Sequence, residues 1–220
     1  AFVDRMNERA QLLGCTGTHF ANTNGLTADD HYTTAYDFYL ISREAIKHPL
    51  FMEICTTDYY EVPATDYCDL RKLNNSNALM SDGSIYGADY LYEGPAGVKT
   101  GYTRAAGYCL VSTCLRGDVD LLAVVMGSTG VLNSDRSDYG NFVDSIALYD
   151  WAFGSFAYRT LLGAEPVTEA EVALSKDGKK VVLKPAEEVR ALLPADVADD
   201  EVNISTVIYD DKLTAPIEAG

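Results

Sequence analysis

The chain has 220 residues and a formal net charge of −16 at pH 7, from 17 Lys and Arg against 33 Asp and Glu. This acidic balance argues against nucleic acid or an anionic membrane surface as a partner, because both attract clustered basic residues. The shares of 47% hydrophobic and 23% charged residues are those of a globular protein. No apolar run reaches the roughly 20 residues that a membrane-spanning helix needs.

Two helices are predicted near the N-terminus. Apolar residues at helical spacing predict the first over residues 1–13, ending at Gly14. Thr34, followed three residues later by Asp37, is typical of a helix start and predicts a second helix that runs to about Lys47. Because the chain opens directly on a helical pattern without a cap, we expect it to be part of a longer polypeptide.

Residues 19–26 and 74–96 are both predicted to be loops, because both are rich in Asn and Gly. The second loop is long, and long loops in compact domains are often functional. It carries Tyr86, Tyr90 and Tyr92. These tyrosines could line a substrate groove or pack the loop, and the sequence leaves both alternatives open.

The middle of the chain is predicted to form an antiparallel sheet. A strand-like pattern broken by Pro63 predicts a hairpin over residues 56–73. A polar loop through Asp138 and a helix over residues 142–156 are predicted to follow the sheet. Helices before and after the strands favour an α/β fold in which helices flank an antiparallel sheet. Its core is a predicted meander of three apolar runs separated by short turns, at residues 96–102, 107–115 and 119–127.

A second, all-β domain is predicted after a change in composition near residue 160. The expected domains are therefore residues 1–158 and residues 159–220. Alternating residues around an Asp-Gly pair indicate a hairpin over residues 172–183. Residues 202–209 are another strand candidate, and the domain is expected to be incomplete.

The five cysteines fit no metal-binding spacing. Cys109 and Cys114 are an odd number of residues apart on one predicted strand, so they face opposite sides of the sheet and cannot pair. Cys55 and Cys68 could meet across the predicted hairpin. Free or buried thiols are the favoured interpretation for all five.

The sharpest candidate for a functional site is Lys99-Thr100-Gly101-Tyr102. On an edge strand, Lys99 offers a positive charge to a carboxylate, and Thr100 offers a hydroxyl donor. Gly101 leaves the backbone bare, so that a ligand can lie against the strand. The pattern fits an acyl group or a peptide with a free C-terminal carboxylate, although a lone Lys-Thr-Gly is more often a solvated lysine and a strand threonine before a turn.

Other short motifs accompany Lys99-Thr100-Gly101 along the chain. They are Phe2-Val3, Thr18-His19-Phe20, Asn22 with Gly25-Leu26, Asn75 with Asn77, and Asp150-Trp151. In this order they resemble the penicillin-binding D-alanyl-D-alanine carboxypeptidases, bacterial serine peptidases of cell-wall metabolism, whose third active-site motif is Lys-Thr-Gly. The resemblance covers residues 1–157 well and implies a fold like that of β-lactamases and transpeptidases. Residues 159–220 are similar to the small β domain of the family, best at Leu213-Thr214-Ala215-Pro216.

The resemblance implies an enzyme that removes the terminal D-alanine from peptidoglycan stem peptides through an acyl-enzyme. It implies a catalytic role for Lys99, and substrate binding by Thr100, Gly101 and Tyr102, with the backbone N–H of Tyr102 forming half of the oxyanion hole. The implied ligands are peptides that end in D-Ala-D-Ala and β-lactams, with no metal or organic cofactor. The implied location is outside the cytoplasmic membrane, in the periplasm or at the cell surface.

The chain departs from the family at the nucleophile. No Ser is followed by Lys three residues later, and the Ser-x-Asn motif is absent. In the family both motifs precede the segment that matches Phe2, so we expect the isolated chain to be inactive and to need a nucleophile segment on its own polypeptide or on a companion chain. Basic residues that some members carry are Ser76 and Gly154 here, which puts carboxylate binding outside Lys99 and Thr100 in doubt.

Two other functions stay open on the sequence alone. The chain could be an inert fragment or a peptide-binding module, or it could be related to the β-lactamases, which share Lys-Thr-Gly but lack a second β domain. The missing segment supplies core helices in the family. Without it an apolar surface would face water, so we expect self-association or a retained partner chain.

Overall fold

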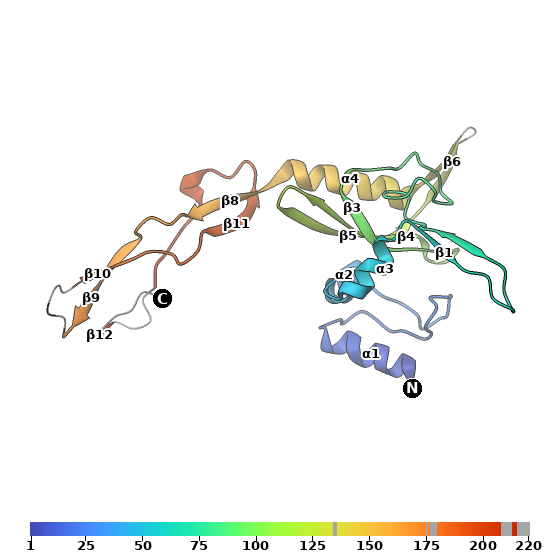
Figure 1. Cartoon of the computed structure of the whole chain (residues 1–220), viewed down its shortest axis with the longest axis horizontal. Coiled ribbons are helices and arrows are strands. Elements are labelled where there is room, and N and C mark those ends of the chain that lie inside the picture. The colour runs from blue at the N-terminus through green and yellow to red at the C-terminus, as the bar shows by residue number, and fades with distance from the viewer. Residues whose placement is uncertain (134–135, 175, 177–179, 208–212, 215–220) are drawn as a thin grey trace. The chain divides into compact units, whose positions relative to one another are not determined.

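The computed structural model describes residues 1–133, 136–174, 176, 180–207 and 213–214 (Figure 1). The chain divides into two compact units, residues 1–152 and residues 153–220. The domain boundary expected at residue 158 stays a prediction.

The centre of the first unit is the predicted meander, an antiparallel sheet in the order β3-β4-β5. Figure 1 shows α4 on one face of this sheet and α2 and α3 on the opposite side. The α/β fold with helices flanking an antiparallel sheet is thereby confirmed. The elements are β3 (Pro95–Thr103), β4 (Gly107–Arg116), β5 (Val119–Ser128), α2 (Ala35–Ala45), α3 (Pro49–Thr56) and α4 (Gly140–Ser155).

Helix α4 is held to the sheet by two large buried side chains. Phe142 is fully buried, and the buried Tyr149 shares a 2.7 Å hydrogen bond with Ser112 of β4. The long loop before β3 packs on the same side chains: the rings of Tyr86 and Tyr90 lie 5.4 and 5.2 Å from that of Phe142. The ring of Tyr92 stacks on that of Tyr149 at 5.9 Å. Of the two roles left open for these tyrosines, the structure supports loop packing.

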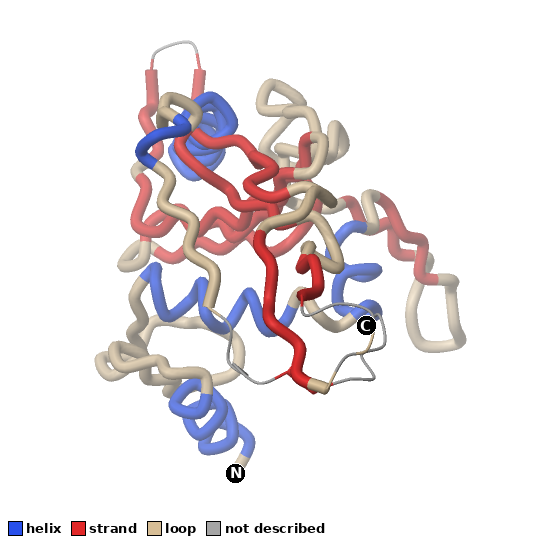
Figure 2. Tube along the Cα trace, turned by 90° about the vertical axis from the view of Figure 1, so that its left-hand side faces the viewer, coloured by secondary structure: helices blue, strands red, loops and turns tan. Residues whose placement is uncertain are grey.

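The N-terminal segment folds as the sequence predicts. Helix α1 (Phe2–Leu12) precedes Gly14, whose φ of +88° only glycine adopts at little cost. Helix α2 begins after Thr34, whose side chain accepts a 3.1 Å hydrogen bond from the Asp37 N–H. In Figure 2 a long loop, drawn tan, follows α1. The helix, this loop and α2 share one small core, built on Ala10, Cys15 and Leu40.

Three elements of the first unit were not predicted: the strand pair β6 and β7, and the helix α3. The polar loop expected through Asp138 contains the antiparallel pair β6 (Gly130–Asn133) and β7 (Arg136–Tyr139), because backbone pairing depends on no particular side chain. Helix α3 was not predicted, although Pro49 is its first residue, a position where proline's missing N–H costs nothing.

The hairpin predicted over residues 56–73 is confirmed as β1 (Tyr59–Val62) and β2 (Arg71–Asn74).

The described residues of the second unit after Ser155 are built from strands and one short 3-10 helix. Strands β8 and β11 pair antiparallel, and a three-stranded sheet has the order β10-β9-β12. The hairpin predicted over residues 172–183 is confirmed, with its Asp-Gly pair outside the described residues. The strand predicted over residues 202–209 is wrong for residues 202–207, which have no regular structure, and residues 208–209 lie outside the described part. The elements are β8 (Phe156–Leu162), β9 (Thr168–Ala173), β10 (Lys180–Leu183), β11 (Val189–Pro194), β12 (Leu213–Thr214) and the 3-10 helix η1 (Asp199–Glu201).

All five cysteines are free thiols in the structure, Cys55 and Cys68 included. Cys15 and Cys114 are buried, whereas Cys68 is exposed. Among the helices of the described residues, none has the length and apolar character needed to cross a membrane.

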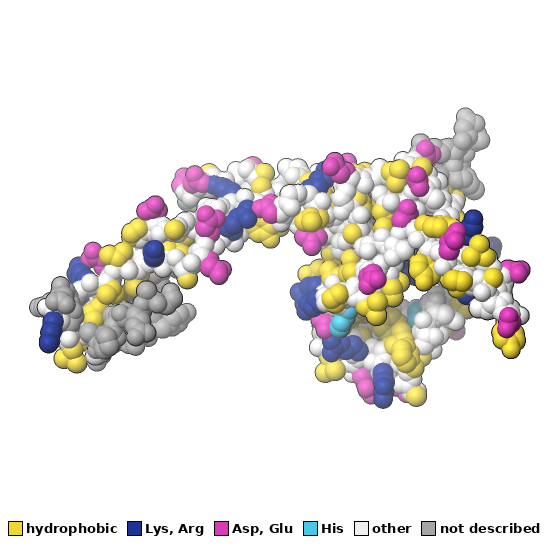
Figure 3. All heavy atoms as spheres, viewed as in Figure 1, with side chains coloured by type: hydrophobic (Ala, Val, Ile, Leu, Met, Phe, Trp, Pro, Cys, Tyr) yellow, Lys and Arg dark blue, Asp and Glu magenta, His cyan; other side chains and the backbone are white. Residues whose placement is uncertain are grey.

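Several large apolar side chains of the first unit face solvent. Figure 3 shows hydrophobic side chains gathered over the helices α1 to α3. Phe2 and Leu12 of α1 and Leu50 and Ile54 of α3 are each about two thirds exposed or more, at 69%, 78%, 66% and 65%. Such a surface is typical of a face that another segment covers. The expected self-association or partner chain stays a prediction.

Candidate active site

The candidate residues lie together on β3, whose only partner among the described strands is β4. Thr100 is buried, at 7% exposure, and Tyr102 is 54% exposed with its ring stacked 4.4 Å from that of Tyr108. The Lys99 ammonium donates to the carbonyl oxygen of Thr100. A Cβ added to Gly101 would meet no atom within 4 Å, so the strand is bare at this residue.

Two cavities meet at Lys99 and Thr100. We call the larger one the α3 cavity; its volume is about 580 Å³, and α3, β2 and the start of the 74–84 loop line it. The smaller one, the α2 cavity, has about 320 Å³ and lies between Phe38 of α2, residues 24–26 and the strands of the sheet. Lys99 and Thr100 line both cavities, whereas Gly101 and Tyr102 line the α2 cavity.

One wall of the α3 cavity is an asparagine-rich turn that contains Asn75, Ser76 and Asn77. Asn75 Nδ2 donates to the carbonyl oxygens of Cys55 and Thr57, at 2.9 and 3.0 Å. The buried Asn77 donates from Nδ2 to the carbonyl oxygen of Gly97 at 2.5 Å. Both asparagines that carry the family resemblance therefore attach this turn to neighbouring segments.

Between them, Ser76 Oγ lies 2.6 Å from Thr100 Oγ1, and either hydroxyl can be the donor. In the sequence, Ser76 stands out only as a departure from the family. Its contact with Thr100 could not be predicted, because no local pattern relates residues that are 24 positions apart.

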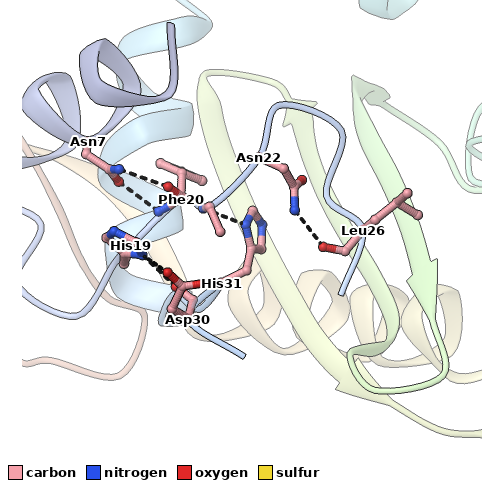
Figure 4. Close-up of polar contacts among 8 residues, drawn as sticks. Asn7, His19, Phe20, Asn22, Leu26, Asp30 and His31 are labelled. Carbon is pink, nitrogen blue, oxygen red and sulfur yellow. Dashed lines mark hydrogen bonds and ion pairs between the residues drawn. The ribbon is translucent and has the colours of Figure 1, made fainter. Parts of the chain in front are cut away.

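The wall of the α2 cavity is the loop after α1, shown in Figure 4. Asn7 of α1 holds the loop at both backbone groups of Phe20, with distances of 2.9 and 2.7 Å. His31 Nδ1 accepts a 3.1 Å hydrogen bond from the N–H of Ala21. Asn22 Nδ2 donates to the carbonyl oxygen of Leu26 at 2.8 Å, which closes the turn that borders the cavity.

Three further hydrogen bonds anchor this loop, one to β3 and two to α2. Thr27 Oγ1 donates to Thr103 Oγ1 of β3 over 3.3 Å. At the other end the buried Asp37 carboxylate accepts from Thr18 Oγ1 and from the Gly17 N–H, both at 2.7 Å. These hydrogen bonds hold the pKa of Asp37 below its ordinary value of 3.8, and the bond from Thr18 has the largest effect.

The α3 cavity is lined by a cation, Lys99 of β3, and by a carboxylate, Glu53 of α3, so a place for an anionic group lies on the β3 side. There the Lys99 cation is next to the Thr100 hydroxyl, which can donate a hydrogen bond. Gly101 follows on the same strand and leaves free space beside the backbone. Burial raises the pKa of the Cys55 thiol, an effect that the charge of Lys99 partly opposes, so Cys55 stays protonated at neutral pH. In the part of the chain that the structure describes, no three His, Cys, Asp or Glu side chains gather as a metal site would require.

The chain is similar in sequence to known proteins over most of its length. The sequence pattern of peptidase family S11, described as D-alanyl-D-alanine carboxypeptidase, matches residues 1–130. D-alanyl-D-alanine carboxypeptidase DacF of Bacillus subtilis is 29% identical over 220 residues, which are 100% of this chain and 52% of the relative. DacA of Escherichia coli is also 29% identical, over 99% of this chain and 49% of its own length. The chain thus spans about half the length of these curated relatives.

The solved structures that resemble this chain include penicillin-binding proteins. Penicillin-binding protein 5 of Haemophilus influenzae is 26% identical, with a TM-score of 0.65 over 98% of this chain and 57% of that one. Penicillin-binding protein D2 of Listeria monocytogenes, solved in the ampicillin-bound form, is 27% identical, with a TM-score of 0.53 over 69% of this chain and 55% of that one.

Proposed function

Since the chain belongs to the D-alanyl-D-alanine carboxypeptidase family, peptidase family S11, we propose that it supplies the carboxylate-binding side of a serine D-Ala-D-Ala carboxypeptidase. The observation that carries the proposal is the juxtaposition of Lys99, Thr100 and the bare Gly101 at the meeting point of two cavities. A segment with Ser-x-x-Lys, on the same polypeptide or on another chain, would supply the nucleophile that this sequence lacks.

In the proposed reaction a serine hydroxyl attacks the carbonyl carbon between two D-alanines. The peptide bond breaks, the terminal D-alanine leaves with the proton, and water then hydrolyses the acyl-enzyme. Lys99 stabilises the negative charge and assists proton transfer, and the Thr100 hydroxyl donates to the terminal carboxylate. The backbone N–H of Tyr102 is one donor of the oxyanion hole, a kind of contact worth about 3 kcal/mol in known enzymes.

The proposed ligands are peptidoglycan stem peptides and β-lactams, and the proposed location is outside the cytoplasmic membrane. Support for the ligands comes from the names of the similar proteins, which include penicillin-binding proteins solved with ampicillin and with cefotaxime. Support for the location is the family resemblance and the substrate, which lies in the cell wall.

The test is the intact mass of the protein after incubation with benzylpenicillin. We expect no adduct on the isolated 24.0 kDa chain and one adduct on the polypeptide that carries Ser-x-x-Lys, whether this is a longer form of the chain or a companion. An adduct on the isolated chain would place a nucleophile within these residues and contradict the proposed division of the site.

If no form is labelled, the chain is an inert fragment or a binding module. The rate at which the adduct is lost separates the remaining alternative, because a β-lactamase hydrolyses its acyl-enzyme rapidly whereas a carboxypeptidase keeps the β-lactam bound.

A further inference from the structure

We propose that Ser76 is a positioning residue for substrate binding, because its hydroxyl orients the Thr100 hydroxyl toward the carboxylate of the substrate. This inference rests on the proposed function. It concerns a residue whose proposed effect on the ligand is exerted through Thr100.

The geometry gives the hydrogen bond between the two hydroxyls a single direction once a ligand binds. Ser76 Oγ and Thr100 Oγ1 are 2.6 Å apart, and both residues line the α3 cavity. A hydroxyl has one hydrogen to donate, and a carboxylate can only accept. When Thr100 donates to the carboxylate, its Oγ1 must therefore be the acceptor of the Ser76 hydrogen. Chained hydrogen bonds of this kind polarise each other, which makes Thr100 a stronger donor.

The backbone around Ser76 is already held in place before any ligand arrives. Ser84 Oγ donates to the carbonyl oxygen of Ser76 at 3.0 Å. On either side, Asn75 and Asn77 donate to carbonyl oxygens of the α3 end and of β3. Because this turn is anchored on three sides, its donor needs little reorganisation when the carboxylate binds, which is the condition for effective electrostatic binding.

The arrangement predicts a specific kinetic effect. The carboxylate belongs to the terminal D-alanine and is bound in both the ground state and the transition state, so a weaker contact raises KM and leaves kcat nearly unchanged. Loss of one neutral hydrogen bond corresponds to about a fivefold change. Only substrates with a free carboxylate should show this rise in KM.

The experiment uses the form of the protein that acquires the benzylpenicillin adduct. KM and kcat are measured on an N-acylated peptide ending in D-Ala-D-Ala and on the same peptide with a C-terminal amide. We expect Ser76→Ala to raise KM for the acid about fivefold with kcat within about twofold, and to leave the kinetics of the amide unchanged. Ser76→Thr, which keeps the hydroxyl, should restore KM.

Ser81→Ala is the matched control, because Ser81 lies in the same loop and its buried Oγ makes no hydrogen bond to any residue that the structure describes. It should change neither parameter. If Ser76→Ala lowers the melting temperature, Ser76→Cys replaces it, since a thiol of similar size is only a weak donor.

An unchanged KM for Ser76→Ala, or an equal change for acid and amide, would overturn the inference while the proposed function stands. A protein that forms no penicillin adduct in any form refutes the proposed function, and this inference with it.

Discussion

Two asparagine-rich loops border β3, and they differ in what their asparagines hold. In the loop of residues 74–84, which we call the docked loop, Asn75 and Asn77 bind N–H groups of their own turn through Oδ1 and carbonyl oxygens of other segments through Nδ2, and Asn77 is 2% exposed. In the loop of residues 19–32, which we call the self-bonded loop, Asn22 and Asn24 bind backbone groups of their own turn only; Asn22 is half-buried and Asn24 is exposed.

The difference shows that burial, more than composition, decides what an asparagine contributes. Water can replace an exposed Asx contact when the side chain is removed, whereas a buried carbonyl or N–H that loses its partner stays unsatisfied. The docked loop should therefore belong to the cooperative core around β3. The self-bonded loop should open locally at a low cost in free energy.

The largest effect is expected from Asn77→Ala. The carbonyl of Gly97 and the N–H of Leu79 would both lose their partner inside the protein, so we expect the free energy of unfolding to fall by about 3 kcal/mol. Urea titration measures it. The matched control is Asn24→Ala in the self-bonded loop, expected to cost less than about 0.5 kcal/mol. Equal costs for the two variants would remove the distinction between the loops.

A smaller, pH-dependent effect is expected from Asp37→Asn at the anchor of the self-bonded loop. Because the folded pKa of Asp37 lies below its ordinary value of 3.8, the stability that the carboxylate contributes is complete above that pH and is lost as the pH falls through the folded pKa. We expect Asp37→Asn to lower the free energy of unfolding at pH 7, by less than Asn77→Ala does, because the carboxylate's charge-assisted hydrogen bonds are weakened. As the pH falls below about 4, the wild type should lose stability more steeply than the variant. Parallel pH profiles from calorimetry would contradict this assignment.

The smallest effect is expected from His31→Ala, which removes the acceptor for the Ala21 N–H. Hydrogen exchange at the Ala21 amide should become about tenfold faster, while the free energy of global unfolding changes by less than about 0.5 kcal/mol. His48→Ala is the control, since His48 is an exposed residue before α3. A large global destabilisation by His31→Ala would instead place the self-bonded loop in the core.

Much of the sheet could be predicted from the sequence because its signals are local. The apolar runs of β3, β4 and β5 are separated by tight turns, and Gly107 and Gly117 adopt positive φ values at those turns. The cap at Thr34 is equally local. Pairings between distant segments could not be predicted, because β8 finds its partner β11 about 30 residues later with no marker in either segment.

The candidate site likewise combines residues that the sequence predicts with contacts between distant segments that it does not predict. Lys99, Thr100 and Gly101 were found from one short motif and its resemblance to a family. The contacts that shape the site, Ser76 to Thr100 and Asn77 to Gly97, depend on how the docked loop returns to β3. Hydroxyl and amide side chains bond in many geometries, so only the folded chain shows which partner each one takes.

The distribution of aromatic side chains decides which optical signal can follow the unfolding of this protein. The single tryptophan, Trp151, is 60% exposed in the folded state, so its fluorescence should change little when the chain unfolds. Tyr90 and Tyr149 are almost fully buried among other rings. The near-ultraviolet circular dichroism of the tyrosines should therefore report the loss of the core, and an experiment that relied on tryptophan emission would miss it.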